Sequence, residues 1–391
     1  MGKAKKWLAL CMAIGMAFGV VGCAGSQAKA ETPKDGYEAT ITSEMQGDTI
    51  ALLSGEILEF ASNYTIGCGV NYAPKLGTQS IDRFAPKPAT ISWENTRDGA
   101  LYYTVRVGLK QDLSDAESYL VSDTSVDIDY LFAAKHYYYQ IYAHYENDEV
   151  VKSRVFDFYT ADLPRTVYIE NVSNTRDIGG RSVLGGKYRM KQGMVYRGAE
   201  VDPSATQRWG AITEEGRRVM LYELGIKTDL DLRNGINLTA SPIDPSLNYV
   251  NVAAPWYAHI YNKEYKEALI TEIKTFANPD NYPIYLHCSL GRDRAGTLAY
   301  LIAALVGVEE IDLYRDYEMS FFAITGWADA EQSEAQHNNL MNSLDAVTSY
   351  IKTYKGNTLM DCTESFVKEY LGITQEEVDS IRSILLEEVT A

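Results

Sequence analysis

The stretch Tyr285–Thr297, YLHCSLGRDRAGT, places Cys288 six residues before Arg294, between an apolar strand-like run and a helix-like run. A loop that joins a strand to a helix gathers backbone amides and the helix N-terminus around one concavity, which suits an anion the size of phosphate. The pKa of a cysteine at the start of such a loop falls below the free value of about 8.5, so the sulfur is a thiolate at neutral pH. The spacing therefore predicts a nucleophilic sulfur beside an anion-binding loop.

The residues around Cys288 have types that suit a bound phosphoryl group. The planar guanidinium of Arg294 matches two phosphoryl oxygens, and a glycine at 291 lets the backbone turn tightly beneath them. The chemistry implied is in-line attack on phosphorus, a phosphocysteine intermediate and hydrolysis by water. The histidine at 287 holds the loop by hydrogen bonding, because a thiolate needs no base. The predicted phosphate-binding residues are His287, Ser289, Leu290, Gly291 and Arg292.

The full string His-Cys-x2-Gly-x2-Arg at a strand-to-helix junction resembles the His-Cys-x5-Arg signature of the protein tyrosine phosphatase superfamily. Residues 165–325 are similar to the bacterial tyrosine phosphatase family related to secreted lipid-and-protein phosphatases. The similar segments, in the family's order, are Asn174–Gly180, Met194–Ala199, Asp229–Arg233 and Asp316–Ser320. The resemblance implies an α/β cysteine-phosphatase domain with a central, mostly parallel sheet flanked by helices. It implies a protein-tyrosine phosphatase, with phosphoserine, phosphoinositide or inositol polyphosphate as other substrates.

The oxygen that leaves phosphorus must be protonated, which requires a general acid. Many superfamily members carry an aspartate on a separate loop after a strand, but the corresponding stretch here, Ala253–Ile260, has no carboxylate. Asp293 is the remaining candidate, and the resembled family uses an aspartate at this position. The alternative is that Asp293 is the N-cap of the following helix. The predicted catalytic residues are therefore Cys288, Asp293 and Arg294.

Two positions depart from the resembled pattern. Arg292 stands where the family usually has lysine, and it either reaches a second phosphate or an inositol ring or is a solvated charge. Ala295 stands where superfamily members carry a hydroxyl that helps to break the phosphocysteine, which implies slow dephosphorylation of the enzyme. Thr297 lies on another face of the helix and does not substitute. A further set is either a structural ion-pair network or a support for phosphate binding: Arg176, Asp177, Arg197 and Arg233.

Strand-like and helix-like segments alternate through residues 165–391, which predicts an α/β catalytic domain. The predicted strands are 227–233, 249–252 and 283–287, and the predicted helices are 265–276, 295–305 and one that ends at 386. Gly307 is placed to cap the middle helix, and Thr374–Glu377 forms a capping box for the last one. Residues 321–354 are either a helical lid over the pocket or a packed pair of helices.

The first 40 residues predict export. Residues 1–22 combine a basic start with about fifteen apolar residues, which is typical of a signal peptide. The run Val20–Cys23 resembles a lipoprotein lipobox, which implies cleavage before Cys23 and a lipid on its sulfur. Residues 23–40 then form a lipid-anchored linker. We therefore expect an extracytoplasmic protein anchored in the cell membrane.

Residues 41–162 predict a separate β domain. Short alternating runs rich in Tyr, Thr and Val, separated by turn residues, are typical of a β-sandwich. The core of this segment, 86–160, resembles a fibronectin type III domain. The resemblance depends on Trp93, on the strand Tyr103–Val107 and on the spacing of a leucine at 131 and a tyrosine at 137.

The formal charge of the 391-residue chain is −17. Removal of residues 1–22, which hold three lysines and no acidic residue, makes it −20, so bulk electrostatics exclude a nucleic-acid partner. The five histidines are not at metal-ligand spacing, and no cofactor is predicted. Beyond the anchor, three cysteines remain, at 68, 288 and 362, of which two can pair. The expected partners are a phosphorylated protein or a phosphoinositide.

Two alternatives to this enzyme stay open. Cys288 is a buried core thiol in a Rossmann-like turn if the loop has no chemical role. In the other alternative the protein is a surface binding protein, in which Ala295 marks a dead pocket that only holds phosphorylated partners.

Overall fold

The computed structural model describes residues 5–6, 40–72, 86–202, 211–323 and 330–389. The chain divides into two compact units, which are treated separately below. The first holds Met1–Ile50, Pro88–Asp129 and Lys135–Thr160, and the second holds Ala51–Lys87, Tyr130–Ala134 and Ala161–Ala391. The predicted signal peptide and the predicted lipid attachment at Cys23 lie outside the described residues, apart from Lys5–Lys6. No helix in the described part of the chain is long and apolar enough to cross a membrane.

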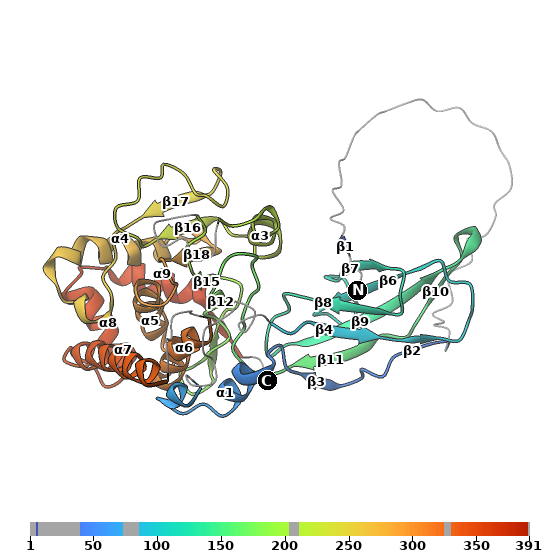
Figure 1. Ribbon diagram of the computed structural model, residues 1–391, viewed down its shortest axis with the longest axis horizontal. Coiled ribbons are helices and arrows are strands. Elements are labelled where there is room, and N and C mark those ends of the chain that lie inside the picture. The colour runs from blue at the N-terminus through green and yellow to red at the C-terminus, as the bar shows by residue number, and fades with distance from the viewer. Residues whose placement is uncertain (1–4, 7–39, 73–85, 203–210, 324–329, 390–391) are drawn as a thin grey trace. The chain divides into compact units, whose positions relative to one another are not determined.

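The first unit contains mostly strands among its described residues (Figure 1). Its larger sheet has the order β1-β7-β6-β9-β11-β3, with β10 beside β9, and two-stranded sheets pair β2 with β5 and β4 with β8. Alternate residues of β9 are buried, as expected for a sheet with one face toward a core. The likeness to a fibronectin type III sandwich stays a prediction. The strands are β1 Lys5–Lys6, β2 Ile41–Thr42, β3 Asp48–Ile50, β4 Ala89–Ser92, β5 Glu94–Asn95, β6 Tyr102–Gly108, β7 Glu117–Val121, β8 Ser125–Ile128, β9 His136–His144, β10 Val150–Lys152 and β11 Phe156–Thr160.

The second unit is built on a five-stranded sheet with the order β12-β15-β18-β16-β17 (Figure 1). The last four of these strands are parallel, and β12 pairs with β15 in the antiparallel sense. The predicted α/β class is therefore confirmed for this part of the chain. The strands are β12 Arg176–Asp177, β15 Val195–Gly198, β16 Thr228–Asp231, β17 Asn248–Asn251 and β18 Ile284–His287.

Helix α5 (Arg294–Val306) follows β18 and is the most buried helix of the second unit, because nearly all of its residues are apolar. Gly307 closes it in the left-handed conformation at φ 96°, as the sequence predicts. The capping box at Thr374 is also present. The other elements of this unit are α1 Gly55–Ser62, β13 Ser182–Val183, β14 Tyr188–Met190, α3 Glu214–Arg218, α4 Lys266–Ala277, α6 Glu310–Ala323, α7 Ala330–Ile351, α8 Leu359–Glu369, α9 Gln375–Leu385 and β19 Leu386–Glu388.

The sequence predicts that residues 51–72 belong to the β domain. In the structure they group with the second unit instead. Helix α1 turns its apolar residues Ile57 and Phe60 into a cluster with Met319 and Phe322 of α6. The buried carboxylate of Glu318 also accepts hydrogen bonds from the amides of residues 67 and 69, at 2.8 Å each. The physical reason for the difference is that this short helix has its apolar partners in a segment about 260 residues later.

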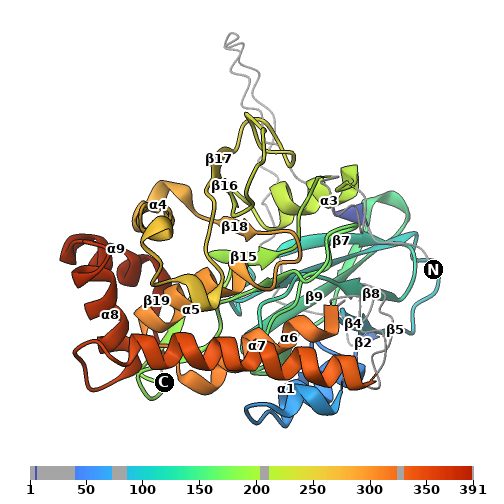
Figure 2. The ribbon, with the colours of Figure 1, turned by 60° about the vertical axis from the view of Figure 1, so that its left-hand side comes forward.

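Helix α7 is a packed helix rather than a lid among its described residues. Figure 2 shows it running alongside α6 and α1. The hydroxyl of Tyr300 on α5 lies 2.8 Å from Thr348 of α7, and Tyr314 of α6 donates to Asp345 at 2.5 Å. Leu344 and Ile351 are fully buried in the main core. Residues 324–329 of the segment predicted as a lid lie outside the described residues.

Glu272 on α4 is a stability liability, because it is 1% exposed and its Oε1 has no hydrogen-bond partner. Burial raises the pKa of this carboxyl from 4.5 to about 8. Its proton is therefore retained in the folded state and lost in the unfolded state between these pH values, so stability falls as pH rises through this range. We expect Glu272→Gln to raise Tm by roughly 5 °C at pH 8 and hardly at pH 4.5. Thermal unfolding at both pH values checks this, and an equal change at both would contradict it.

Candidate active site

The loop 288–293 lies where three parallel strands end. β18 is flanked by β15 and β16, and the carboxyl ends of parallel strands meet at one edge of a sheet, where ligands bind in α/β folds. A pocket of about 350 Å³ opens there. It is lined by Asn234, Ala254, Trp256, Tyr265, Cys288, Ser289, Leu290, Asp293 and Arg294. The structure thus brings together the three predicted catalytic residues.

The other predicted phosphate-binding side chains are not all in this pocket. Ser289 and Leu290 line it, whereas His287, Gly291 and Arg292 are not among the lining residues. His287 and Arg292 have buried side chains that bind other protein groups. Any contribution of residues 291 and 292 to phosphate binding therefore comes from their backbone.

The carbonyls of residues 289–292 are held from outside the loop. Three donors make four hydrogen bonds: the Glu200 amide to Ser289 O (3.4 Å), Asn174 Nδ2 to Leu290 O (2.9 Å), and Arg197 Nη2 to both Gly291 O (2.7 Å) and Arg292 O (2.9 Å). In a trans peptide the N–H points away from the preceding C=O. We infer that the amides of residues 290–293 are directed to the opposite side of the loop, where the pocket lies.

Gly291 makes this loop shape possible. Its φ is +67°, a left-handed value that favours glycine. A Cβ at this position would lie 2.3 Å from the carbonyl carbon of Gly198 on β15, so no larger residue fits without displacing backbone. The loop therefore lies directly on the end of the neighbouring strand.

Cys288 is 2% exposed at the base of the pocket, and Arg294 lies at the first position of α5. The guanidinium of Arg294 donates to the carbonyl of Leu232 at 3.2 Å and to Ser289 Oγ at 3.4 Å. These bonds hold the guanidinium of Arg294 at the pocket wall. Arg294 is six residues after Cys288, and both residues line the same pocket. This arrangement suits a tetrahedral anion seated over Cys288.

Asp293 does not act as a side-chain N-cap. It precedes α5, but its side chain makes no capping hydrogen bond. Its carboxylate instead pairs with Arg292, whose Nε lies 3.0 Å from Oδ1. The same pair explains why Arg292 is buried rather than solvated or free to reach a second phosphate. The carboxylate is thus held at the pocket wall in a fixed position.

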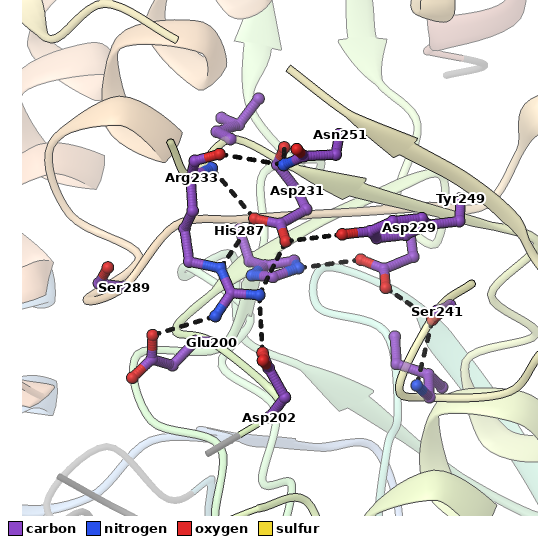
Figure 3. A network of polar contacts seen from close by, with 12 residues as sticks. Glu200, Asp202, Asp229, Asp231, Arg233, Ser241, Tyr249, Asn251, His287 and Ser289 are labelled. Atoms are coloured by element: carbon purple, nitrogen blue, oxygen red, sulfur yellow. Dashed lines mark hydrogen bonds and ion pairs between the residues drawn. The ribbon is translucent and has the colours of Figure 1, made fainter. Parts of the chain in front are cut away.

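His287 is fully buried between the loop and a carboxylate. Its Nε2 lies 3.0 Å from Asp229 Oδ1, and Ser241 donates to the other oxygen of Asp229 at 2.6 Å (Figure 3). Burial would lower the pKa of His287, but the carboxylates of Asp231 and Asp229 outweigh it and raise the pKa. The histidine therefore pairs the end of β18 with β16. The predicted hydrogen bond from His287 to the loop is not found, because the ring faces the Asp229 carboxylate, and His287 is not among the described residues that line the pocket.

Arg233 forms ion pairs with three carboxylates beside this histidine (Figure 3). Its guanidinium pairs with Asp231 and Asp202 at 2.7 Å each and with Glu200 at 3.2 Å. Burial would lower the pKa of Arg233, but the carboxylates of Asp231 and Asp202 outweigh this effect and raise the pKa well above its ordinary value. This network joins the end of β16 to the segment that follows β15, which confirms the structural interpretation of Arg233.

Comparison with known proteins identifies the family. The profile described as the tyrosine phosphatase family matches residues 167–387, which is more than half of the chain. The chain belongs to the tyrosine phosphatase family. It is also similar to the probable tyrosine-protein phosphatase DG1060 of Dictyostelium discoideum, at 27% identity over 74 residues. That match covers 19% of this chain and 45% of the relative.

Several residues of this candidate site were not assigned a role from the sequence. Asn174 and Asp316 stand in segments that resemble the family, but their contacts join residues more than a hundred positions apart. Trp256 and Tyr265 line the pocket. The sequence analysis considered the segment around Trp256 only as a place for a general acid, and it has no carboxylate. The aromatic residues that follow the end of β17 could have indicated an apolar pocket wall.

Thr297 makes structural contacts beside the candidate site. Its hydroxyl donates to the carbonyl of Asp293 at 2.9 Å and accepts from the amide of Tyr257 at 2.8 Å. It is not among the residues that line the pocket. Thr297 therefore ties the segment after β17 to α5. Cys68 and Cys362 carry free thiols and form no disulfide.

Proposed function

We propose that this protein hydrolyses phosphomonoesters through a phosphocysteine intermediate, with phosphotyrosine in proteins as its main substrate. The observation that carries this is the meeting of Cys288, Asp293 and Arg294 in one pocket, beside a loop in which the carbonyls of residues 289–292 are engaged elsewhere. Family membership supports phosphatase activity. The backbone amides and Arg294 would stabilise the charge that develops on the phosphoryl oxygens.

The reaction has two steps. In the first, the thiolate of Cys288 forms a bond to phosphorus as the bond from phosphorus to the substrate oxygen breaks, and that oxygen takes a proton from Asp293. In the second, water attacks phosphorus and gives a proton to the Asp293 carboxylate, and the S–P bond breaks. The products are the free alcohol or phenol, inorganic phosphate and the regenerated thiolate.

The pocket lining favours an aryl monophosphate over an inositol polyphosphate. Among the described lining residues, Arg294 is the one cation, whereas a ligand with several phosphates needs several. Trp256, which is 54% exposed, and Tyr265 present aromatic surface to the pocket. A phenyl ring packs well against such a wall. Phosphoserine and phosphoinositide substrates are expected to be slower.

The test is hydrolysis of a phosphotyrosine peptide in EDTA, beside a phosphoserine peptide and inositol hexakisphosphate. We expect turnover of the tyrosine peptide that vanadate inhibits, and much slower release of phosphate from the other two. Fastest release from the inositol compound would favour the polyphosphate alternative. Binding of the phosphopeptide without any turnover would favour the surface binding protein.

Trp256→Ala is expected to raise KM for the phosphotyrosine peptide about 5- to 10-fold, because the aromatic contact is lost. KM for the phosphoserine peptide should change less than about twofold. Tyr222, which is 64% exposed and is not a pocket residue, offers the matched control Tyr222→Ala. An equal rise for both peptides would count against the aromatic wall.

The enzyme is proposed to act outside the cytoplasm, anchored by a lipid on Cys23, with the fibronectin type III-like segment between anchor and phosphatase. The basic start, the apolar run and the run Val20–Cys23 support this. A fatty-acid analogue should label the wild type and not Cys23→Ala. Equal labelling of the two would remove the anchor from the proposal.

A further inference from the structure

Arg197 is 1% exposed and contacts the loop 288–293, which we call the phosphate loop. Its position is on β15, the strand next to β18, and one of its nitrogens donates to two successive loop carbonyls. We propose that Arg197, held by Asp316, is a positioning residue that aims loop amides at the substrate phosphate. This inference rests on the proposed function.

The peptide geometry gives the mechanism. Arg197 Nη2 lies 2.7 Å from Gly291 O and 2.9 Å from Arg292 O. Because each peptide is planar and trans, fixing these carbonyls toward the interior turns the N–H groups of Arg292 and Asp293 the other way. A single guanidinium thus sets the direction of two adjacent donors. Tyr257 adds a weaker bond from its hydroxyl to the second carbonyl, at 3.3 Å.

Asp316 on α6 fixes the guanidinium of Arg197. Its Oδ2 lies 2.5 Å from Arg197 Nη1, and its Oδ1 lies 2.8 Å from Nε of Arg176. Burial would raise the pKa of this carboxyl, but Arg176 and Arg197 outweigh it and lower the pKa well below the ordinary value. The carboxylate therefore stays ionised and the pair stays formed at any pH where the enzyme would act.

The backbone leaves room for this arginine. A Cβ added at Gly296, in the first turn of α5, would lie 2.7 Å from Arg197 Nη2 and 2.1 Å from the Tyr257 hydroxyl. At the next residue of β15, a Cβ on Gly198 would lie 2.3 Å from the Tyr285 hydroxyl. Gly296 on the helix therefore leaves room for the guanidinium of Arg197 and the Tyr257 hydroxyl, and Gly198 on the strand leaves room for the Tyr285 hydroxyl.

The competing explanation is that Arg197 only satisfies buried carbonyls and stabilises the fold. Arg165 offers a matched comparison, because it is 4% exposed, pairs with Asp177 at 3.0 Å and donates to the carbonyls of Tyr130 and Leu131. It makes none of the bonds to the phosphate loop described above. Equivalent substitutions at 165 and 197 therefore separate stability from loop geometry.

The experiment compares Arg197→Lys with Arg165→Lys, because lysine keeps the charge and loses the planar fork. We expect Arg197→Lys to lower kcat for the phosphotyrosine peptide about 100-fold, the scale seen when a preorganised donor is lost. We also expect alkylation of Cys288 by iodoacetamide to move to higher pH, because the amides no longer stabilise the thiolate. Arg165→Lys should lower Tm while leaving kcat and the alkylation profile within about twofold of wild type.

The outcomes separate this inference from the proposed function. A wild-type Cys288 that alkylates only at the pH of an ordinary thiol would overturn the proposed function itself. A reactive wild-type thiol with an unchanged profile in Arg197→Lys, or with equal shifts in both lysine variants, would overturn only the role of Arg197. If Arg197→Lys does not fold, the same two measurements on Asp316→Asn decide: losses beyond those of Arg165→Lys support the role, and matching values overturn it.

Discussion

Cys288→Ser is expected to lower kcat by about 10⁴-fold or more, the largest effect of any single substitution in the chain. The hydroxyl of serine stays protonated near neutral pH, and Asp293 must itself carry a proton in the first step, so it cannot also take one from this hydroxyl. Asp293 is the lining carboxylate, and it is paired with Arg292. Steady-state hydrolysis of the phosphotyrosine peptide, with a detection limit below one part in 10⁵, measures this loss.

Two controls show that the loss is chemical. Cys288→Ser should bind the phosphopeptide nearly as tightly as the wild type, because the loop amides and Arg294 are unchanged. Cys362→Ser replaces a thiol of comparable burial, 5% exposed on α8, and should keep full activity. Residual activity of Cys288→Ser within about tenfold of wild type would show that another nucleophile, or water alone, attacks phosphorus.

Asp293→Asn is expected to have the second-largest effect, and its size should depend on the leaving group. General acid catalysis contributes about 10²- to 10⁴-fold when the departing oxygen needs a proton. The loss should approach this range for an alkyl phosphate, whose alkoxide is a poor leaving group. It should be about tenfold or less for para-nitrophenyl phosphate, whose phenoxide leaves without protonation.

The leaving-group series is itself the control for Asp293→Asn. Loss of the Arg292 pair disturbs the loop equally for every substrate, so a structural effect lowers all rates by the same factor. Equal losses on the alkyl and aryl compounds would therefore remove the acid role. They would leave Asp293 as the residue that holds Arg292 against the loop.

Several local features of the second unit were predictable from the sequence, because each depends on residues only a few positions apart. Gly307 ends α5 since a left-handed residue closes a helix, and Thr374 begins α9 with a capping box that spans four residues. The strand, loop and helix around Cys288 follow from a short apolar run and a glycine. These patterns need no knowledge of distant residues.

The remaining parts of the site depend on contacts between distant segments. Asn174, Arg197 and Asp316 meet at the phosphate loop although they lie on different elements, and no pattern within one segment encodes that meeting. The orientation of the Arg292 side chain also depends on the folded structure. Its charge suggested either a second phosphate subsite or a solvated side chain, but Arg292 is 7% exposed and pairs with its neighbour Asp293.

The docking of α1 on α6 has a practical consequence for recombinant work. A truncated protein that starts at Arg165, where the α/β pattern of the sequence begins, would lack the helix that covers Met319 and Phe322. Both side chains, now fully or almost fully buried, would face water, and Glu318 would lose two of its amide donors. Soluble, active protein should therefore require a boundary before Ala51, so the smallest usable expression fragment is longer than the family match alone suggests.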